Sequence, residues 1–370
     1  MIFDCKAEDR FIGLMSGTSL DGVDAVLVQF PAPQQVRVLG RASLPYPVPL
    51  RQALLRLQEN HAGELHQAAC VGKQLATLYA EVVEQLLGTC QLSPSAIKAI
   101  ACHGQTIRHA PEHGYTLQIG NPARLAELSG IDVVADFRSR DIAAGGQGAP
   151  LVPAFHAAVF AHPQQQRVVA NIGGIANISI LSPNDTVLGF DTGPGNMLLD
   201  AWIQQQRGLA WDERGQWASQ GQVLPDVLHR LLAEPYFSLP PPKSTGRDLF
   251  SLAWLQSMLS GTESAVDVQA TLLAFTVESL SQAIERHATE SEAVFVCGGG
   301  AYNHALMAAL QQRLAPRFIS TTATLGIPEM DVEAVAFAWL GQAFFAGHAG
   351  NLPAVTGARG PRRLGAYYPA

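Results

Sequence analysis

The composition of this chain argues against several classes of partner and site. Its 370 residues carry 24 Lys and Arg against 31 Asp and Glu, a net charge of −7, without a basic run, so we expect no nucleic acid partner. With 48% hydrophobic residues the chain can bury a large core, and its length favours about two domains. The five cysteines are odd in number and never form a Cys-x-x-Cys pair, which predicts reduced thiols.

No segment predicts export or a membrane span. The first ten residues include three acidic side chains and lack the apolar core of a signal peptide. The most apolar late segment, residues 334–346, is too short to cross a bilayer and is predicted to form a buried helix. We therefore expect a soluble, cytoplasmic protein with no membrane partner.

A glycine- and hydroxyl-rich loop near the N-terminus is the first candidate for a ligand site. The letters LMSGTSLDG at residues 14–22 lie between two strand-like runs. Gly17 and Gly22 are expected to turn the backbone with positive φ angles, and the hydroxyls and amides between them can face an anion. Asp21 at the tip suggests a divalent cation between its carboxylate and a phosphate. An ordinary hairpin turn, for which Asp-Gly is a standard signal, stays open as the alternative.

Strand-like and helical runs alternate along the chain, which predicts an α/β fold. Residues 63–87 carry apolar side chains at helical spacing and predict one amphipathic helix. Residues 97–102 look like a buried strand that leads directly into the polar cluster 103–106. That cluster, which begins with His103, lies where open α/β sheets bind ligands, at the carboxyl end of a strand. A structural, hydrogen-bonded role for this histidine stays open.

A domain junction is predicted between residues 136 and 153, where glycine, proline and polar residues concentrate. The first domain is expected to cover residues 1–135 with a C-terminal return at about 348–370, and the second to cover residues 136–347.

A second run of strand, glycine turn and strand follows the junction at residues 168–181 and contains Asn171, Gly173 and Gly174. It echoes the first loop in form. Two such hairpins, one opening each half of the chain, would let two similar domains each offer backbone groups to one nucleotide in a cleft between them.

Asp191 is the candidate catalytic residue. It is predicted to end a short strand, because the glycines and proline at residues 193–195 prevent either secondary structure from continuing. Its carboxylate should then project into a cleft, where it can act as a general base. A turn-forming or helix-capping Asp is the alternative. A helical run is predicted at residues 197–206.

A third glycine turn follows a strand-like run at residues 294–297. The glycines at 298–300 let a flat base or ribose lie against the backbone, and a helix is predicted to begin near Asn303. The turn fails the dinucleotide fingerprint, because Asn303 stands where the third glycine would fall.

Other nucleotide, hydrolase and metal motifs lack support. Residues 243–247 end like a P-loop, but Pro242 replaces the glycine that a Walker A motif requires before the lysine. The chain has no Gly-x-Ser-x-Gly nucleophile elbow in its serine-containing loop and no His-Glu-x-x-His, so a serine hydrolase and a zinc enzyme are not indicated.

The glycine turns, the Asp after the second one and the two-domain layout resemble the superfamily of sugar kinases, heat-shock chaperones and actin. The resemblance narrows to the anhydro-N-acetylmuramic acid kinases, whose motifs are similar to those at residues 14–22, 103–106, 118–122, 135–138, 145–151, 171–174, 191–196, 243–247 and 297–300. It spans roughly Phe11 to the C-terminus, and several long motifs in one order are more specific than one turn. The fold that it implies is α/β, a two-domain actin-like ATPase (ribonuclease H-like) fold with an interdomain cleft.

The resemblance implies a kinase of peptidoglycan recycling that takes 1,6-anhydro-N-acetylmuramic acid, ATP and water to N-acetylmuramic acid 6-phosphate and ADP. It also implies Mg²⁺ as cofactor and a homodimer. In that chemistry Asp191 deprotonates the water that attacks the anomeric carbon. Oxygen 6 becomes the nucleophile toward the γ-phosphate as the anhydro bond opens.

The resemblance also suggests which residues hold the ligands. Phosphates are assigned to the first two glycine loops, through Ser16, Gly17, Thr18, Ser19, Asp21, Asn171, Gly173 and Gly174. Mg²⁺ is expected near Asp21, held through water. The adenosine part is assigned to the third turn, through Gly298, Gly299, Gly300 and Asn303. Sugar contacts are assigned to His103, Arg140 and Glu333, although Arg140 also fits a solvated or salt-bridged residue and Glu333 a favourable first-turn acid.

Two alternative functions stay open. A kinase of an ordinary sugar or small carboxylic acid would phosphorylate a free hydroxyl without opening an anhydro ring. A non-metabolic ATPase, like the actin or chaperone relatives, would use ATP to change domain closure. The chain has no recognisable extra substrate-binding domain after the third glycine turn, which argues against the second alternative.

Overall fold

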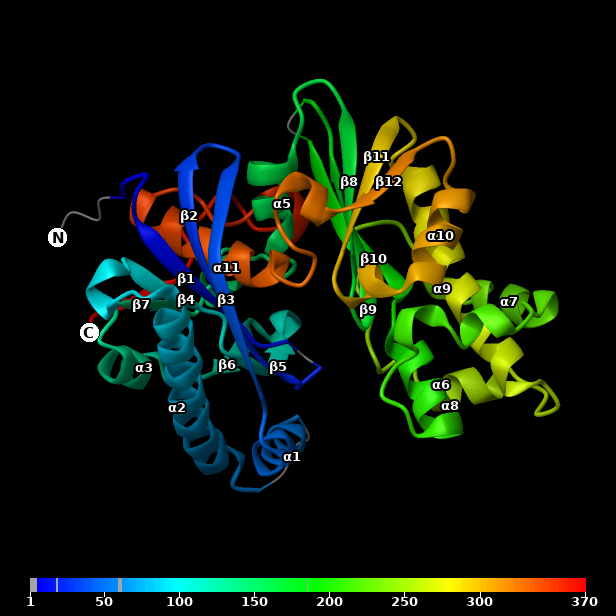
Figure 1. The fold of residues 1–370 in the computed structure, drawn as a ribbon, viewed down its shortest axis with the longest axis horizontal. Coiled ribbons are helices and arrows are strands. Elements are labelled where there is room, and N and C mark those ends of the chain that lie inside the picture. Colours follow the sequence, from blue (N-terminus) through cyan, green and yellow to red (C-terminus); the bar gives the residue numbers. More distant parts are fainter. Residues whose placement is uncertain (1–4, 18, 59–61, 185) are drawn as a thin grey trace. The chain divides into compact units, whose positions relative to one another are not determined.

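The computed structural model describes residues 5–17, 19–58, 62–184 and 186–370 of the chain. The chain forms two compact units, of which the first joins Met1–Val159 with Asp331–Ala370 and the second comprises Phe160–Met330. Helices and strands alternate in both, so the predicted α/β class is confirmed. Figure 1 labels most of these elements.

The first unit is built on a mixed sheet. Its strands are Arg10–Met15 (β1), Gly22–Ala32 (β2), Gln35–Pro45 (β3), Ala99–Cys102 (β4), Val133–Ala135 (β7) and Ala366–Tyr368 (β13). They lie in the order β13-β7-β4-β1-β2-β3, with β1, β4 and β7 parallel and the other pairings antiparallel. A separate hairpin joins β5, Gln105–Ala110, to β6, Tyr115–Ile119. Because β1 and β4 are parallel neighbours, the segments that follow them lie side by side.

Two long helices cover this sheet. α2, Glu64–Cys90, packs on β2 and β3, whereas α11, Val332–Ala346, packs on β1, β2 and β4. Successive side chains of β1 point to opposite faces. Ile12 and Leu14 belong to the core around α2, while a Cβ at Gly13 would collide with the carbonyl oxygen of Ala334 in α11. The predicted helices at 63–87 and 334–346 are therefore both confirmed.

The shorter helices of this part of the chain are α1 (Val48–Leu57), α3 (Pro122–Ser129), α4 (Ser139–Ala143), α5 (Val152–Phe160) and α12 (Pro353–Thr356). Of these, α1 and α3 pack on α2, and α4 packs on β6.

The second unit repeats the strand order of the first. Its strands are Gln166–Ile172 (β8), Ile175–Leu181 (β9), Val187–Pro194 (β10), Ser291–Cys297 (β11) and Phe318–Thr321 (β12). The order is β10-β9-β8-β11-β12, with antiparallel β8-β9 and β9-β10 pairs and parallel β8-β11 and β11-β12 pairs. Read in the order β3-β2-β1-β4-β7, the sheet of the first unit has the same pattern, two antiparallel pairs followed by two parallel pairs. This repeat confirms the predicted fold of two similar α/β halves.

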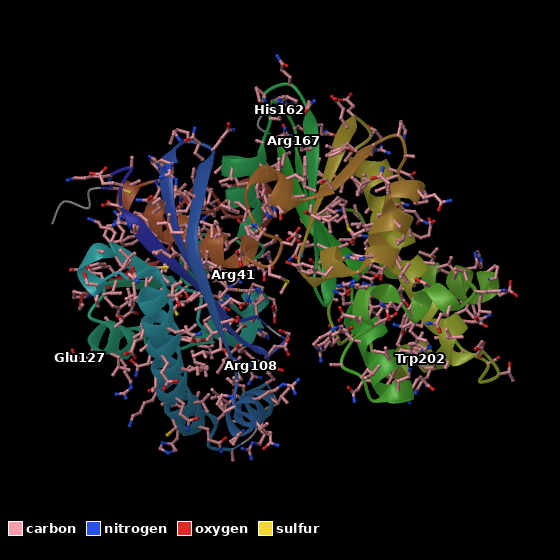
Figure 2. All side chains as sticks on the ribbon, viewed as in Figure 1. Arg41, Arg108, Glu127, His162, Arg167 and Trp202 are labelled. Atoms are coloured by element: carbon pink, nitrogen blue, oxygen red, sulfur yellow. The ribbon has the colours of Figure 1, made fainter. Side chains whose placement is uncertain are left out.

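The helices of the second unit gather around α9, Ala265–His287, which packs on β9 and β10. The others are α6 (Met197–Arg207), α7 (Pro225–Leu232), α8 (Leu252–Ser257) and α10 (His304–Arg313). Trp202, labelled in Figure 2, donates its indole N–H from α6 to the Ala265 carbonyl at 2.8 Å, which fixes the start of α9. The helix predicted at 197–206 is thus confirmed.

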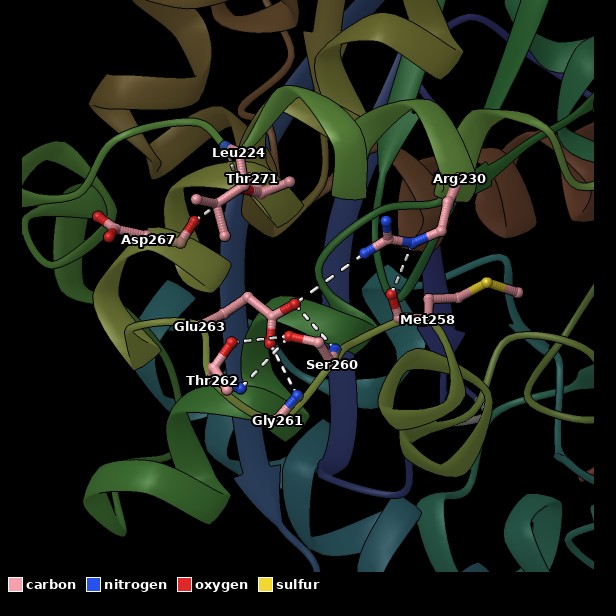
Figure 3. A network of polar contacts seen from close by, with 9 residues as sticks. All are labelled: Leu224, Arg230, Met258, Ser260, Gly261, Thr262, Glu263, Asp267 and Thr271. Atoms are coloured by element: carbon pink, nitrogen blue, oxygen red, sulfur yellow. Dashed lines mark hydrogen bonds and ion pairs between the residues drawn. The ribbon is translucent and has the colours of Figure 1, made fainter.

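A polar network outside the sheet holds the turn between α8 and α9 (Figure 3). The Glu263 carboxylate accepts the backbone N–H groups of Ser260 and Gly261 at 2.8 and 2.9 Å, and these bonds lower the pKa of Glu263 to about 2. Arg230 of α7 lies 4.0 Å from the same carboxylate and donates to the Met258 carbonyl. The network therefore ties α7 to the turn that leads into α9.

The division into units differs from the expected domain boundaries at residues 136 and 348. Residues 136–159 and 331–347 belong to the first unit. The reason is packing: α11 lies against β1, β2 and β4, and the buried Asp141 side chain accepts hydrogen bonds from Asn351 and Thr356. Composition marks the polar loop at 136–153, but it does not show which sheet that loop packs on.

Within the described residues, no helix combines the length and the apolar character needed to cross a membrane.

Candidate functional site

The first glycine loop joins β1 to β2, and the carbonyl groups of Ser16 and Gly17 are bonded inside the first unit. Nδ1 of His103 lies 3.1 Å from the Ser16 carbonyl oxygen. The Gln105 side-chain amide donates to the Gly17 carbonyl at 3.0 Å. Both side chains follow β4, the parallel neighbour of β1, as the polar cluster at 103–106 predicted. Thr18 lies outside the described residues.

The hydroxyl of Ser16 points into the unit. Its Oγ donates to the Gly104 carbonyl at 3.0 Å and lies 2.8 Å from the Tyr79 hydroxyl, and the residue is only 2% exposed. The hydroxyl is therefore not free to face an anion as the sequence suggested, and the backbone is the part of Ser16 left for that role. Ser19, in contrast, is exposed.

Among the described residues of this loop, Leu20 has a positive φ angle, of 58°, whereas Gly17 and Gly22, where positive angles were expected, do not. Leu20 is 2% exposed, so its core packing compensates for a left-handed backbone that disfavours branched side chains. Gly22 is required by space, since a Cβ there would collide with the Leu44 carbonyl. Gly17 would meet no atom closer than Ser19 Oγ at 3.9 Å, so packing does not explain this glycine.

His103 is held on both ring nitrogens. Arg138 donates to its Nε2 through Nε at 3.2 Å and through the guanidinium Nη2 at 2.9 Å. The ring proton is therefore on Nδ1, which donates to Ser16. Burial, together with the charge of Arg138, lowers the pKa of His103 to about 3, so the ring is neutral in the physiological range.

Arg138 is a site residue that sequence reasoning missed, although it closes the motif at 135–138. Its third nitrogen donates to the Gly148 carbonyl at 2.8 Å. Burial lowers the pKa of Arg138 to about 10, while the charges of Glu333 and Asp141 oppose that shift. The guanidinium therefore stays charged at neutral pH.

Acidic side chains gather near the end of the first loop. Asp21 is exposed at the loop tip. Desolvation of its carboxyl group and the charges of Asp331 and Asp21 raise the pKa of Asp24, and Arg41 Nη1 lies 4.0 Å from Asp331. Among the described residues, no group of three His, Cys, Asp or Glu side chains could hold a metal ion directly, so a magnesium ion near these carboxylates would have to be held through water. Asp24 and Asp331 carry no motif signal, and only the fold brings them near Asp21.

The two remaining candidates for sugar contact lie in the same unit. Arg140 is exposed on α4, and Glu333 is half-buried in the first turn of α11. The negative charge of Glu333 acts on Arg138, which places it beside the His103 network.

The second glycine turn, between β8 and β9, has the same inward carbonyl pattern as the first. The Gly173 carbonyl accepts the Asn196 N–H at 2.8 Å, and the Gly174 carbonyl accepts those of Gly195 and Met197 at 2.9 and 3.1 Å. A Cβ on Gly173 or Gly174 would meet nothing closer than 3.6 Å. The start of α6 thus fastens the turn, and the outer side of its glycines stays open.

Asp191 lies within β10, so the prediction that it ends a strand is wrong. The strand continues to Pro194, and a β-bulge between Asp191 and Gly193 shifts its register against β9. Gly193 takes a φ of 135°, which accommodates the bulge. A bulge re-aims a side chain without ending the strand, which is why the glycines and proline did not stop it.

The segment at 236–245 encloses Asp191. Thr245 donates its backbone N–H to the Asp191 Oδ2 at 3.0 Å, and the Lys243 carbonyl accepts the Asp191 N–H at 3.1 Å. The Tyr236 hydroxyl donates to the Asp191 carbonyl at 2.7 Å. Burial raises the pKa of Asp191 to about 6, against the lowering effect of the Thr245 N–H. The motif at 243–247 was the only sequence signal for the residues that hydrogen-bond to Asp191.

The third glycine turn packs directly on β8. A Cβ at Gly298 would collide with the Asn171 side-chain oxygen, and one at Gly300 with the Ile172 side chain. Gly299 is exposed and would accept a Cβ without a collision. Asn303 caps α10 as its Oδ1 accepts the Leu306 N–H at 3.1 Å, which confirms the helix start predicted there.

An open groove of about 550 Å³ lies beside the start of α10 in the second unit. Its lining residues are Arg214, Gln216, Ser219, Gln220, His304 and Ala305. Gly215, next to the lining residues Arg214 and Gln216, packs closely against Asn303 just after the third turn, because a Cβ at this glycine would collide with the Asn303 side chain.

Each unit thus assembles one part of the predicted site. The first brings Ser16 and Gly17 together with His103 and its partner Arg138, and the second contains Asp191 with the second and third glycine turns, which follow the neighbouring strands β8 and β11. The interdomain cleft stays a prediction.

Comparison with known proteins gives one consistent family. A family model described as "Anhydro-N-acetylmuramic acid kinase" matches residues 9–370. A protein of that name from Chromobacterium violaceum is 54% identical over 369 residues, covering 98% of this chain and 99% of that protein. One of the same name from Nitrosospira multiformis is 54% identical over 362 residues, covering 97% and 99%. The similarity therefore includes both units and every loop described above.

Proposed function

This chain belongs to the family of anhydro-N-acetylmuramic acid kinases, and we propose that it converts 1,6-anhydro-N-acetylmuramic acid, ATP and water to N-acetylmuramic acid 6-phosphate and ADP. The observation that carries the chemical part of the proposal is the carboxyl group of Asp191. It is mounted on a bulge, oriented by the Thr245 N–H, and has a pKa of about 6. A general base works best when its pKa lies near the operating pH.

In the proposed reaction Asp191 takes a proton from water as the water oxygen attacks the anomeric carbon. The bond between that carbon and oxygen 6 breaks, so oxygen 6 gains the electron pair. It then attacks the γ-phosphorus of ATP, and ADP leaves. The proton on Asp191 returns to solvent, which restores the base for the next turnover.

The glycine turns are suited to the triphosphate. Gly17, Gly173 and Gly174 have carbonyls bonded inward and space where a side chain would otherwise stand. Close approach of a ligand to the backbone is one reason for glycine at such positions. We assign the phosphates to these loops, with Ser19 and Asn171 beside them.

The adenosine part is assigned to the second unit, beside the third turn. Gly299 is exposed there, and the groove next to Asn303 offers polar and cationic side chains. Gly298 and Gly300 support this site indirectly, because they let the turn pack on β8.

Mg²⁺ is proposed near Asp21, held through water, with Asp24 and Asp331 supplying further negative charge in the same unit. When bound, the ion neutralises charge on the transferring phosphoryl group.

Arg140 and Glu333 are proposed to contact the sugar, Arg140 through the lactyl carboxylate. An exposed guanidinium suits such a partner because its planar fork binds carboxylates in bidentate fashion. We further propose a homodimer in the cytoplasm, as the resemblance implies. Sedimentation velocity of the purified chain tests the dimer.

Turnover in oxygen-18 water tests the reaction. The proposal requires one label at the anomeric oxygen of the sugar phosphate, acquired during the reaction itself. Because a free anomeric hydroxyl also exchanges with water, a control incubates unlabelled product in the same water for the same time. Unlabelled product formed faster than this exchange, or equal turnover with an ordinary sugar, would refute ring opening by water.

A further inference from the structure

Both ring nitrogens of His103 are engaged within the first unit. Nδ1 lies 3.1 Å from the Ser16 carbonyl oxygen, and Nε2 accepts two N–H groups from Arg138. The residue is 5% exposed, and its ring lies 4.7 Å from the ring of Phe337, centroid to centroid. A ligand atom would have to displace one of these partners to bond the imidazole.

The partner at Nε2 decides which nitrogen carries the proton. A guanidinium can only donate, so Nε2 must accept and the hydrogen must lie on Nδ1. Arg138 is itself anchored, through the Gly148 carbonyl at 2.8 Å. The Gly148 N–H is in turn bonded to the fully buried Asp141 at 2.8 Å. The ring orientation is therefore set by a chain of bonds within the segment at 138–148, which contains α4.

The bond to Ser16 has a consequence for the other side of the loop. In a trans peptide unit the C=O of one residue and the N–H of the next point in opposite directions. Drawing the Ser16 carbonyl toward His103 therefore turns the Gly17 N–H away from the protein interior. A backbone N–H that points outward at a glycine is the donor that a phosphate oxygen needs.

We infer that His103 is a positioning residue for the nucleotide phosphates and not a sugar ligand: Arg138 fixes its ring so that Nδ1–H holds the Ser16 carbonyl and presents the Gly17 N–H to MgATP. This inference rests on the proposed function, in which the loop at 16–21 receives the phosphates. It reassigns the one sugar-contact candidate that the structure buries.

Two polar substitutions at position 103 distinguish the role of Nδ1 from that of Nε2. His103→Asn places an amide nitrogen near the Nδ1 position and can still donate to Ser16. His103→Gln places its amide near Nε2, where it can meet Arg138 but not the Ser16 carbonyl. We expect the MgATP dissociation constant, measured by calorimetry, to stay within about threefold for Asn and to rise at least about tenfold for Gln. The KM for the anhydro-sugar at saturating MgATP should change by less than about threefold in both.

Thermal unfolding of each variant, and of His348→Gln, supplies the controls. His348 is exposed in the same unit, and its variant should match the wild type in both measurements. A raised sugar KM with unchanged MgATP affinity in both position-103 variants would make His103 a sugar ligand and overturn the inference. An equal loss of MgATP affinity in His103→Asn and His103→Gln would overturn the inference too. The inference requires that a donor at the Nδ1 position, which only the Asn variant keeps, preserves MgATP binding. Wild-type protein that binds MgATP but ignores the anhydro-sugar would refute the proposed function and leave this inference standing.

Discussion

Oδ2 of Asp191 accepts the backbone N–H of Thr245 at 3.0 Å, across 54 residues of sequence. The bond selects one orientation for a carboxyl group whose pKa burial raises to about 6. It favours the ionised form, because a carboxylate is a stronger acceptor than a neutral carboxyl group. The contact that joins β10 to the segment at 243–247 therefore orients the proposed base and opposes part of the rise in its pKa that burial causes.

Replacing Asp191 should separate chemistry from nucleotide binding. We expect Asp191→Asn to lower kcat at least about 10²-fold, the lower bound for a positioned general base. Its MgATP dissociation constant should stay within about threefold, since the amide is nearly isosteric and lies outside the glycine turns. Asp226→Asn, an exposed acid on α7, is the matched control and should behave as the wild type. Near-normal turnover of the Asp191 variant would remove this residue from the base role.

The same carboxyl group predicts the pH profile. Asp191 must be ionised to take a proton, so kcat/KM should fall about tenfold per unit below an apparent pKa near 6. Thr245→Pro removes the N–H that favours the carboxylate, and its acidic limb should move to higher pH. Thr245→Ala keeps that N–H and should leave the limb in place. A limb that does not move in the Pro variant would show that this bond does not tune the base.

Stability should depend on pH in the opposite sense to activity. The folded-state pKa of about 6 lies above the 3.8 of a solvated Asp side chain, so the protonated form is favoured in the fold. The contribution to stability is fully present below about pH 4 and is lost as the pH rises through about 6. Two pKa units correspond to about 3 kcal/mol, less after allowing for the partial exposure of Asp191. In thermal unfolding, Asp191→Asn should exceed the wild type at about pH 8 and match it at about pH 4. Equal curves at both values would contradict the raised pKa.

Two glycines of one loop should respond differently to an added methyl group. Gly17→Ala meets no atom within 3.9 Å, so the free energy of unfolding should change by less than about 0.5 kcal/mol. The MgATP dissociation constant should nevertheless rise roughly tenfold, because the methyl group occupies the space proposed for phosphate. Gly22→Ala must displace the β3 backbone at Leu44 and should cost about 1–3 kcal/mol. Unchanged MgATP affinity in Gly17→Ala would argue against phosphate at this loop.

The C-terminal segment should depend on Asp141. This buried carboxylate accepts the Gly148 N–H, the Asn351 amide and the Thr356 hydroxyl at 2.8, 2.6 and 2.8 Å. Asp141→Ala leaves those donors buried without an acceptor, and we expect a loss of about 3 kcal/mol in urea unfolding. Glu127→Ala, an exposed acid on α3 of the same unit, should cost less than about 1 kcal/mol. Similar losses in both variants would show that burial of Asp141 carries no special weight.

The residues assigned from motifs differ in how much the sequence revealed about them. Glycine turns at 173–174 and 298–300 were visible from composition and spacing, and so were the strands and helices on either side. The sequence did not show which of these glycines are required by close packing. Gly298 and Gly300 are explained by collisions with Asn171 and Ile172, whereas Gly173 is not, and that distinction depends on neighbours brought together by β-pairing.

The sequence by itself determined the family, the α/β class, the two similar halves and the chain positions of the three glycine turns. It did so because turns, strands and helices depend on local residue types and their spacing. Only the tertiary structure decided that Arg138 holds His103, that Thr245 holds Asp191, and that the segments at 136–159 and 331–347 pack on the first sheet. Those relationships join residues far apart along the chain, and the free energy that fixes them comes from burial and hydrogen bonding across elements, which no local pattern records.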